Sequence, residues 1–572
     1  MDNKNKMIIY QTFPRLFGNI NDSLTHNGSK DENGVGKFSD YSIRTLHKIK
    51  ELGVTHIWYT GVIEHATQTD YTAFGIRPDH SAIVKGKAGS PYAIKDYYDI
   101  DPDLAARTPE RMEEFRSLVG RTHKAGLKVI IDFVPNHVAR QYASDAKPPY
   151  IEDLGEHDRT NHAFDIHNNF YYIPGQPLAI YFGNQHEDFV YTEFPAKATG
   201  NNRFDPYPGK DDWYETVKLN YGIDYPHGGE AHFCPHPGTW GKMLDILRFW
   251  ASMGVDGFRC DMAEMTPVEF WEWAIPEIKK TYGIIFIAEI YNPSVYRDFL
   301  HRGHFDYLYD KVGLYDTLRS VIRAEAPASN ITYCWQSVEG IQHQMLNFLE
   351  NHDEQRIASD FFAGNPEAGF PGMIVAATMN TNPVMIYNGQ ELGERGMDNE
   401  GFSGPDGRTT IFDYWSMTAV RNWINNWTFN DDKLTQAQLA LRNNYARLLT
   451  LAREEPVFAC GQFYDLAYAN LSNPGFNPHR LYAYLRKYRN ELALVAVNFD
   501  KADRQADIHI PSEAFTALGV NENEVAGQTD LFTGKKTVCA LSGAYPYHTK
   551  IPAYGGRILK FTYKPCLSIN CK

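Results

Sequence analysis

Cysteine is scarce in this chain and follows no recognisable spacing. Only seven cysteines occur among 572 residues, and they show neither the paired spacing of a disulfide framework nor a CxxC metal motif. The first six residues are polar and lead directly into a strand-like segment at 7–10, which leaves no room for the apolar segment of a signal peptide. Both features favour a reducing compartment, and we expect a cytoplasmic protein.

Long apolar runs and an excess of basic residues are also absent. No stretch reaches the roughly 20 apolar residues that cross a bilayer, so we expect no membrane partner. The formal net charge of -14 argues against the clustered Lys and Arg of a nucleic-acid groove. Aromatic residues make up 14% of the chain. Most belong in a core, but tyrosine and tryptophan also stack on sugar rings, so the composition favours an uncharged ligand.

A repeated pattern sets the predicted architecture. Helical runs end at glycine and lead into short apolar strands at 51–58, 125–131 and 253–258, as expected of βα units. One such helix is predicted over 108–125, with Thr108 at its N-cap. Eight strands alternating with helices predict a (β/α)8 TIM barrel. The strands are expected at 7–13, 55–61, 128–134, 255–261, 284–290, 305–311, 346–351 and 382–388.

The third and fourth predicted strands lie much too far apart for an ordinary barrel connection. We therefore expect an inserted domain after strand three, irregular in structure and forming one wall of a cleft at the barrel's carboxyl-terminal face. After about residue 455 the pattern changes to alternating strands, which predicts a C-terminal antiparallel β-domain, a β-sandwich. The predicted division is 1–137 and 239–455 for the barrel, 138–238 for the insertion and 456–572 for the C-terminal domain.

Four short segments follow apolar runs and carry carboxylates. They are 132–137 (DFVPNH), 257–261 (GFRCD), 287–289 (IAE) and 351–353 (NHD). Residues that end the strands of such a barrel point into its carboxyl-terminal mouth, so Asp132, Asp261, Glu289 and Asp353 are expected to converge there. Cleaving a glycosidic bond needs one carboxylate at the anomeric carbon and one protonated carboxyl at the leaving oxygen. The sequence therefore indicates a glycosidase.

These segments, in this order, resemble the four sequence regions of the α-amylase family of glycoside hydrolases, and the resemblance covers essentially the whole chain. It implies that Asp261 is the nucleophile, Glu289 the general acid/base and Asp353 the carboxylate that stabilises the transition state. The resemblance further implies three side chains that contact the sugar in the reactive subsite: His137 and His352, which bond its hydroxyls, and Tyr92, an aromatic platform.

Two more residues are expected to support the site. Arg259 lies two positions before Asp261 and so on the same face of a strand, where a charge-assisted bond would hold the nucleophile ionised. An ordinary structural salt bridge is the alternative for Arg259. Asp132 resembles the first-region aspartate that supports the site through neighbouring groups. Both are grouped with the expected substrate-binding residues.

A metal is implied only by the resemblance. Many relatives bind a structural Ca²⁺ between barrel and insertion, which would make Asn136 a ligand here. Calcium takes about six to eight oxygen ligands, which one Asn cannot specify. The segment 31–36 is vaguely similar to a calcium loop of oligosaccharide-cleaving relatives, but Val35 and Lys37 replace oxygen donors, and we favour a plain turn. No organic cofactor is expected.

The chain departs from the family pattern after its nucleophile. Many relatives carry Lys and His three and four residues later, where they contact leaving-group sugars, whereas this chain has Glu264 and Met265. Met265 is therefore placed beside the expected leaving-group subsites, where a thioether offers no good hydrogen bonds. We expect a preference for short oligosaccharides. The following segment, 267–273, is similar to that of maltosyltransferases that use maltose 1-phosphate.

The sequence as a whole favours a retaining α-glucan hydrolase that cleaves α-1,4-glucosidic bonds of malto-oligosaccharides or starch fragments by double displacement. The alternative enzyme is a glucanotransferase or maltosyltransferase of the same family with a sugar or phosphate acceptor. A non-catalytic barrel is a third possibility, against which the intact carboxylates argue. The expected partner is an α-glucan oligosaccharide or polysaccharide, and no oligomeric state is predicted.

Overall fold

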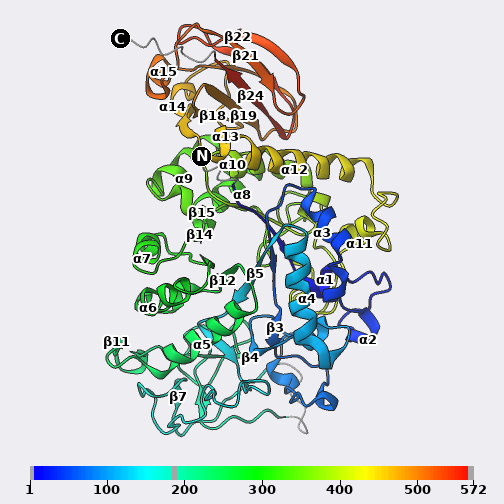
Figure 1. Ribbon diagram of the computed structural model, residues 1–572, viewed down its shortest axis with the longest axis vertical. Helices are drawn as coiled ribbons and strands as arrows, with labels where there is room; N and C mark the ends of the chain where they lie inside the picture. Colours follow the sequence, from blue (N-terminus) through cyan, green and yellow to red (C-terminus); the bar gives the residue numbers. More distant parts are fainter. Residues whose placement is uncertain (1–5, 183–189, 564–572) are drawn as a thin grey trace.

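The computed structural model describes residues 6–182 and 190–563, and its centre is a closed parallel barrel (Figure 1). The strands follow the order β15-β14-β13-β12-β5-β2-β1-β16, and a parallel bridge between Asn347 and Val384 joins the two ends. All eight predicted strands are present. They are β1 Ile8–Thr12, β2 His56–Tyr59, β5 Lys128–Phe133, β12 Gly257–Cys260, β13 Ile285–Ala288, β14 Tyr307–Tyr309, β15 Met345–Leu346 and β16 Val384–Tyr387.

Side-chain alternation along these strands makes two cores. Inward-facing residues fill the barrel, among them Ile9, Trp58, Ile130, Ile287 and Met385. Their sequence neighbours face outward and join a larger cluster with the surrounding helices. These helices include α3 Ile43–Lys50, α4 Arg111–Lys124, α5 Gly238–Ser252, α6 Val268–Lys279, α7 Tyr296–His301, α8 Asp316–Ile322, α10 Phe370–Thr378 and α12 Gln436–Glu454. No helix in the described ranges is both long enough and apolar enough to cross a membrane.

The chain between β5 and α5 forms the insertion expected after the third strand. Within its described part, short antiparallel pairs link β6 to β9, β7 to β8 and β10 to β11. The first pair starts at the barrel, because β6 follows β5 after a few residues. The strands are β6 His137–Ala139, β7 Tyr172–Ile173, β8 Ala196–Lys197, β9 Thr216–Lys218, β10 Ile223–Asp224 and β11 Glu230–Ala231.

The C-terminal part is an antiparallel β-domain with a core of its own. Its main sheet has the order β17-β18-β19-β24-β21-β22, and β20 pairs with β23. Helix α10 joins this domain to the barrel, for Thr378 is hydrogen-bonded to Tyr484 at 2.5 Å. The insertion lies at the opposite end of the molecule (Figure 1). The strands are β17 Gln462–Asp465, β18 Leu481–Tyr488, β19 Glu491–Asn498, β20 Arg504–Ile508, β21 Val525–Asp530, β22 Lys536–Ala540, β23 Tyr547–Ile551 and β24 Gly555–Thr562.

Candidate active site

The three expected catalytic carboxylates line one cavity at the carboxyl ends of the strands. Asp261 directly follows β12 and Glu289 directly follows β13, while Asp353 comes from the loop after β15. The cavity has a volume of about 250 Å³ and adjoins a second one, also lined by Asp353, of about 300 Å³. The wall of the first cavity is completed by Lys85, Ser90, Tyr92, His137, Trp213, Glu215, Thr216, Met262, Tyr291, Ile411 and Phe412.

Arg259 contacts two of these carboxylates. Its guanidinium is buried and places Nη1 2.8 Å from Asp261 Oδ1 and Nη2 2.7 Å from Glu289 Oε2. The planar guanidinium presents separate N–H groups to the two carboxylates in a fixed geometry, whereas a lysine offers one compact charge on a flexible stem. Burial raises the pKa of Asp261, as do Glu289 and Asp353, while Arg259 opposes the shift. The arginine therefore favours the ionised form that a nucleophile needs.

Glu289 is held in place by two hydrogen bonds. Its Oε2 accepts from the backbone N–H of Met262 at 2.8 Å, and its Oε1 accepts from the Tyr291 hydroxyl at 2.6 Å. Met262 adopts a left-handed conformation with φ of 41°, which is uncommon outside glycine and is found at functional sites. Tyr291 was not predicted from the sequence. In an extended chain, a residue two positions beyond Glu289 lies on the same face as Glu289.

Tyr92, His352 and Asp132 form one hydrogen-bonded unit. The Tyr92 ring stacks on His352 with centroids 5.2 Å apart, and its hydroxyl lies 2.6 Å from His352 Nε2 and 3.3 Å from Asp132 Oδ1. Asp132 also accepts from Trp58 Nε1 at 3.0 Å and does not line the cavity. The side-chain nitrogen Nε2 of Gln11 lies 2.8 Å from His352 Nδ1. Gln11 was not predicted from the sequence.

The pKa of Asp353 is shifted in the opposite direction from that of Asp261. Burial alone would raise it, but His352 and Arg259 outweigh burial and leave the pKa of Asp353 below its usual value. The Oδ2 of Asp353 lies 3.0 Å from His352 Nε2. The cavity thus brings together carboxylates with different proton affinities, an arrangement typical of acid/base sites.

The insertion supplies the opposite wall. The Trp213 ring lies 5.1 Å from the His137 ring, and Glu215 pairs with Lys85 at 3.1 Å. Burial first, then Lys218 and Lys85, lower the pKa of His137 to about 3, so its imidazole is neutral. None of the wall residues Trp213, Glu215 and Lys85 was predicted from the sequence. Trp213 and Glu215 reach the barrel only through the folded insertion, and Lys85 lies on a loop in the first part of the barrel.

The two residues after the nucleophile that depart from the family pattern do not line this cavity. The Glu264 carboxylate accepts from the backbone N–H groups of Tyr291 and Asn292, at 2.9 Å and 3.1 Å. Met265 belongs to a short 3₁₀ turn, and its carbonyl accepts from Lys218 Nζ at 3.0 Å. Met265 as a substrate contact stays a prediction.

The residues around Asn136 do not fit a calcium ion. Its Oδ1 accepts from the Lys218 side chain, and its Nδ2 donates to the Gly200 carbonyl at 2.8 Å. Burial lowers the pKa of Lys218 to about 7. The single polar oxygen that Asn136 offers is therefore taken by a donor. The segment 31–36 begins with the helical turn α2 Lys30–Asn33 and its capping box, in agreement with a plain turn.

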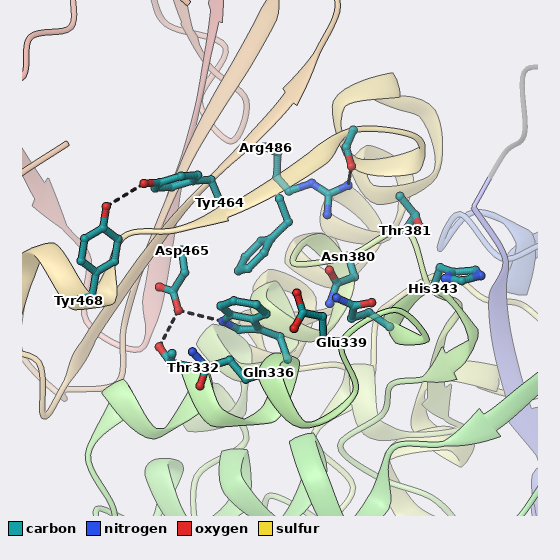
Figure 2. Close-up of a pocket in the computed structure, with 14 residues that line it drawn as sticks. Thr332, Gln336, Glu339, His343, Asn380, Thr381, Tyr464, Asp465, Tyr468 and Arg486 are labelled. Carbon is teal, nitrogen blue, oxygen red and sulfur yellow. Dashed lines mark hydrogen bonds between the residues drawn. The ribbon is translucent and has the colours of Figure 1, made fainter. Parts of the chain in front are cut away.

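A larger cavity, of about 630 Å³, lies at the other end of the barrel (Figure 2). Figure 2 shows its polar side chains, among them Gln336, Asp465 and Arg486, between a barrel helix and the C-terminal domain. Asn380 and Thr381 precede β16 and His343 precedes β15, so this cavity is at the strands' amino ends. None of the three expected catalytic carboxylates lines it.

Known proteins resemble this chain in both sequence and fold. The model of the α-amylase catalytic domain matches residues 11–284. Neopullulanase 2 of Thermoactinomyces vulgaris is 24% identical, over 68% of this chain and 57% of its own length. Alpha-amylase MalA of Haloarcula japonica is 25% identical, over 68% and 44%. The chain thus spans about half the length of these two relatives.

A solved structure matches nearly the whole chain. It is the maltogenic α-amylase AmyB of Thermotoga neapolitana, with a TM-score of 0.62, 19% identity, and coverage of 98% of this chain and 100% of that one. At such identity the likeness speaks for the fold, which includes barrel and C-terminal domain alike. The matched family model runs from the end of β1 through β12 to Ile284, a little under half of the chain, and together with the relatives and the shared fold it supports assignment to the α-amylase family.

Proposed function

We propose that this protein is a retaining α-glucan hydrolase that cleaves α-1,4-glucosidic bonds of malto-oligosaccharides or starch fragments. The observation that carries the proposal is the placement of Arg259 between Asp261 and Glu289, with Asp353 on the same cavity. Glycoside cleavage requires one carboxyl group as nucleophile and a second as proton donor at the same sugar, and this cavity offers both. The scarcity of cysteine supports a cytoplasmic location.

The first step forms a covalent intermediate. The ionised Asp261 attacks the anomeric carbon while the bond to the leaving oxygen breaks, and Glu289 gives that oxygen its proton. Arg259 stabilises the carboxylate before attack. Asp353 then interacts with the positive charge that develops on the sugar ring. His352 and the neutral His137 offer hydrogen bonds to sugar hydroxyls.

The second step returns the enzyme to its starting state. A water molecule attacks the anomeric carbon, Glu289 accepts its proton, and the bond to Asp261 breaks. Two inversions at one carbon leave the product in the α configuration. A glucanotransferase or maltosyltransferase would run the same two steps with a sugar or phosphate in place of water.

The charge of Glu264 does not argue against a phosphate acceptor. An unpartnered Glu264 in the cleft would repel phosphate, but its carboxylate is bound to two backbone N–H groups outside the cavity lining. Water is therefore proposed as the acceptor on the family likeness alone. Incubation with maltodextrin, with and without inorganic phosphate, decides between acceptors. A net gain of reducing ends in both reactions supports hydrolysis. Redistributed chain lengths with no gain of reducing ends would mean transfer to a sugar, and phosphate-dependent maltose 1-phosphate would mean transfer to phosphate.

A further inference from the structure

We propose that the Lys218 side chain takes the place of a structural metal ion at the joint between barrel and insertion, and that it positions His137 through Asn136. The first half concerns stability and metal binding and stands without any assumption about activity. The second half rests on the proposed function, because it assigns His137 to the sugar site.

The contacts of Lys218 join three separate segments. The residue lies on β9, where it pairs with His137 of β6, and its side chain is buried. Its Nζ donates to Asn136 Oδ1, just beyond β5, and to the Met265 carbonyl, four residues past Asp261. The Tyr225 ring lies 5.8 Å from the same nitrogen. One amine thus binds an oxygen atom at the start of the insertion, on Asn136, and another in the loop after the nucleophile, on Met265.

A divalent cation cannot share this position. Calcium needs about six to eight oxygens at roughly 2.3 to 2.6 Å. The two oxygens here already accept from an amine, and no carboxylate among residues 6–182 and 190–563 pairs with that amine. In the described ranges, the one group of carboxylates close enough to hold a metal is Glu64, Asp96 and Asp99. That group lies on β3 Ile63–His65 and β4 Ile94–Ile100 and includes none of the residues that Lys218 contacts.

Lys218 also fixes which way the Asn136 amide faces. The protonated amine has only hydrogen-bond donors, so the amide turns its oxygen toward Lys218 and its NH₂ group away. That NH₂ group then donates to the Gly200 carbonyl at 2.8 Å and faces His137 Nδ1 at 3.1 Å. The Nδ1 atom is therefore the acceptor, and Nε2 carries the ring proton of a cavity-lining histidine. Lys218 sets the tautomer of His137 without touching the sugar.

The stability test compares the whole protein with and without metal. Wild-type protein is dialysed against EDTA, its calcium content is measured, and Tm is recorded in EDTA and in millimolar CaCl₂. We expect no stoichiometric calcium and the same Tm in both buffers. A rise of Tm in CaCl₂ that Asn136→Ala abolishes would overturn the proposal. This arm needs no variant of Lys218 and no activity, so it stands if such a variant fails to fold.

The kinetic test uses Lys218→Met with Lys197→Met as the matched control. Lys197 is another lysine of the insertion, on β8, whose Nζ donates to the Arg140 carbonyl at 3.1 Å. Losing the donor leaves the Asn136 oxygen unpaired and frees the amide to turn. We expect Lys218→Met to lower Tm and to lower kcat/KM about tenfold, partly through a higher KM, beyond any change in the control.

The outcomes separate this inference from the proposed function. If Lys218→Met and Lys197→Met match in Tm and in KM, the positioning role is wrong even though the enzyme hydrolyses glucans. If wild-type protein shows no glycosidase activity on any maltodextrin, the proposed function and the role toward His137 both fail. The proposal that Lys218 replaces a metal ion is then tested only by comparing Tm in EDTA with Tm in CaCl₂. Lys218→Arg, which keeps a donor, is expected to recover part of the lost Tm.

Discussion

At the scale of single residues, the site is organised around one buried arginine. Arg259 contacts Asp261 and Glu289 directly and lies 3.4 Å from Asp132. The sequence predicted the first contact from the two-residue period of a strand. It could not predict the contact to Glu289, because that depends on the neighbouring strand β13. Tyr291 and Met262 escaped prediction for a related reason: their roles depend on a turn conformation and on a partner across the site.

Removing either reacting carboxyl should stop the reaction without unfolding the protein. Asp261→Asn lacks the nucleophile, and Glu289→Gln lacks the proton that the leaving oxygen needs. We expect losses of several orders of magnitude in kcat on maltotriose, with near-native circular dichroism and Tm. Turnover within a few-fold of wild type in either folded variant would refute the assignment.

A lysine in place of Arg259 should change the pH dependence. Arg259 opposes the raised pKa of Asp261, and the compact ammonium of a lysine lacks the planar fork whose two nitrogens lie against Asp261 and Glu289. In Arg259→Lys the pKa of Asp261 rises further, so the nucleophile is lost to protonation at higher pH. The acid limb of the kcat/KM profile should therefore move to higher pH.

Arg140→Lys is the control for this shift. Arg140 is another buried arginine, paired with Glu193 at 2.8 Å, and it does not line the cavity. Its substitution should leave the acid limb unmoved. A profile of Arg259→Lys that coincides with wild type, or that moves toward lower pH, would show that Arg259 does not govern Asp261.

At the scale of elements, regular strands were the easiest to predict. Short, largely apolar runs mark the barrel strands, and all eight were found. The ends of helices were harder to predict. Helix α4 starts at Arg111, after a 3₁₀ turn at Thr108–Glu110. Thr108 as its N-cap is therefore wrong, because Thr108 is the first residue of that turn and Glu110 is the N-cap of α4. The insertion was predicted only as an irregular excursion, since its β6–β9 pairing joins residues far apart in the chain.

Trp213 gives the insertion a direct test. Its ring lies beside His137 on the cavity wall, where it offers an aromatic face to a sugar. Trp213→Ala should raise KM for maltotriose about tenfold, the size expected when one stacking contact is lost. Tyr207→Ala, an exposed aromatic of the same insertion, should leave KM unchanged. Equal KM values in the two variants would remove Trp213 from the substrate site.

At the scale of the whole molecule, a different part of the chain packs at each end of the barrel. The C-terminal domain packs at the amino ends of the strands through α10, while the insertion closes over the carboxyl ends (Figure 1). The boundaries predicted at 137, 238 and 455 stay predictions, although the secondary structure changes character near each. Family resemblance predicted a calcium ion at Asn136, and the placement of Lys218 is what argues against it.

The size of the cavity favours short substrates. About 250 Å³ beside the carboxylates, with an adjoining cavity of about 300 Å³, gives room for few sugar units. Met265, whose carbonyl is bound by Lys218, provides no side-chain hydrogen bond for leaving-group sugars. We expect kcat/KM to be higher for maltotriose and maltotetraose than for long amylose, measured per reducing end. A steady rise with chain length would contradict this.

The stereochemistry of the product tests the central claim most directly. Nucleophilic attack by Asp261 followed by attack of water implies two inversions at the anomeric carbon. Proton NMR of a maltotriose digest, recorded before mutarotation, should show the newly formed reducing sugar in the α configuration. A first product in the β configuration would mean a single displacement by water, and Asp261 could not then be the nucleophile.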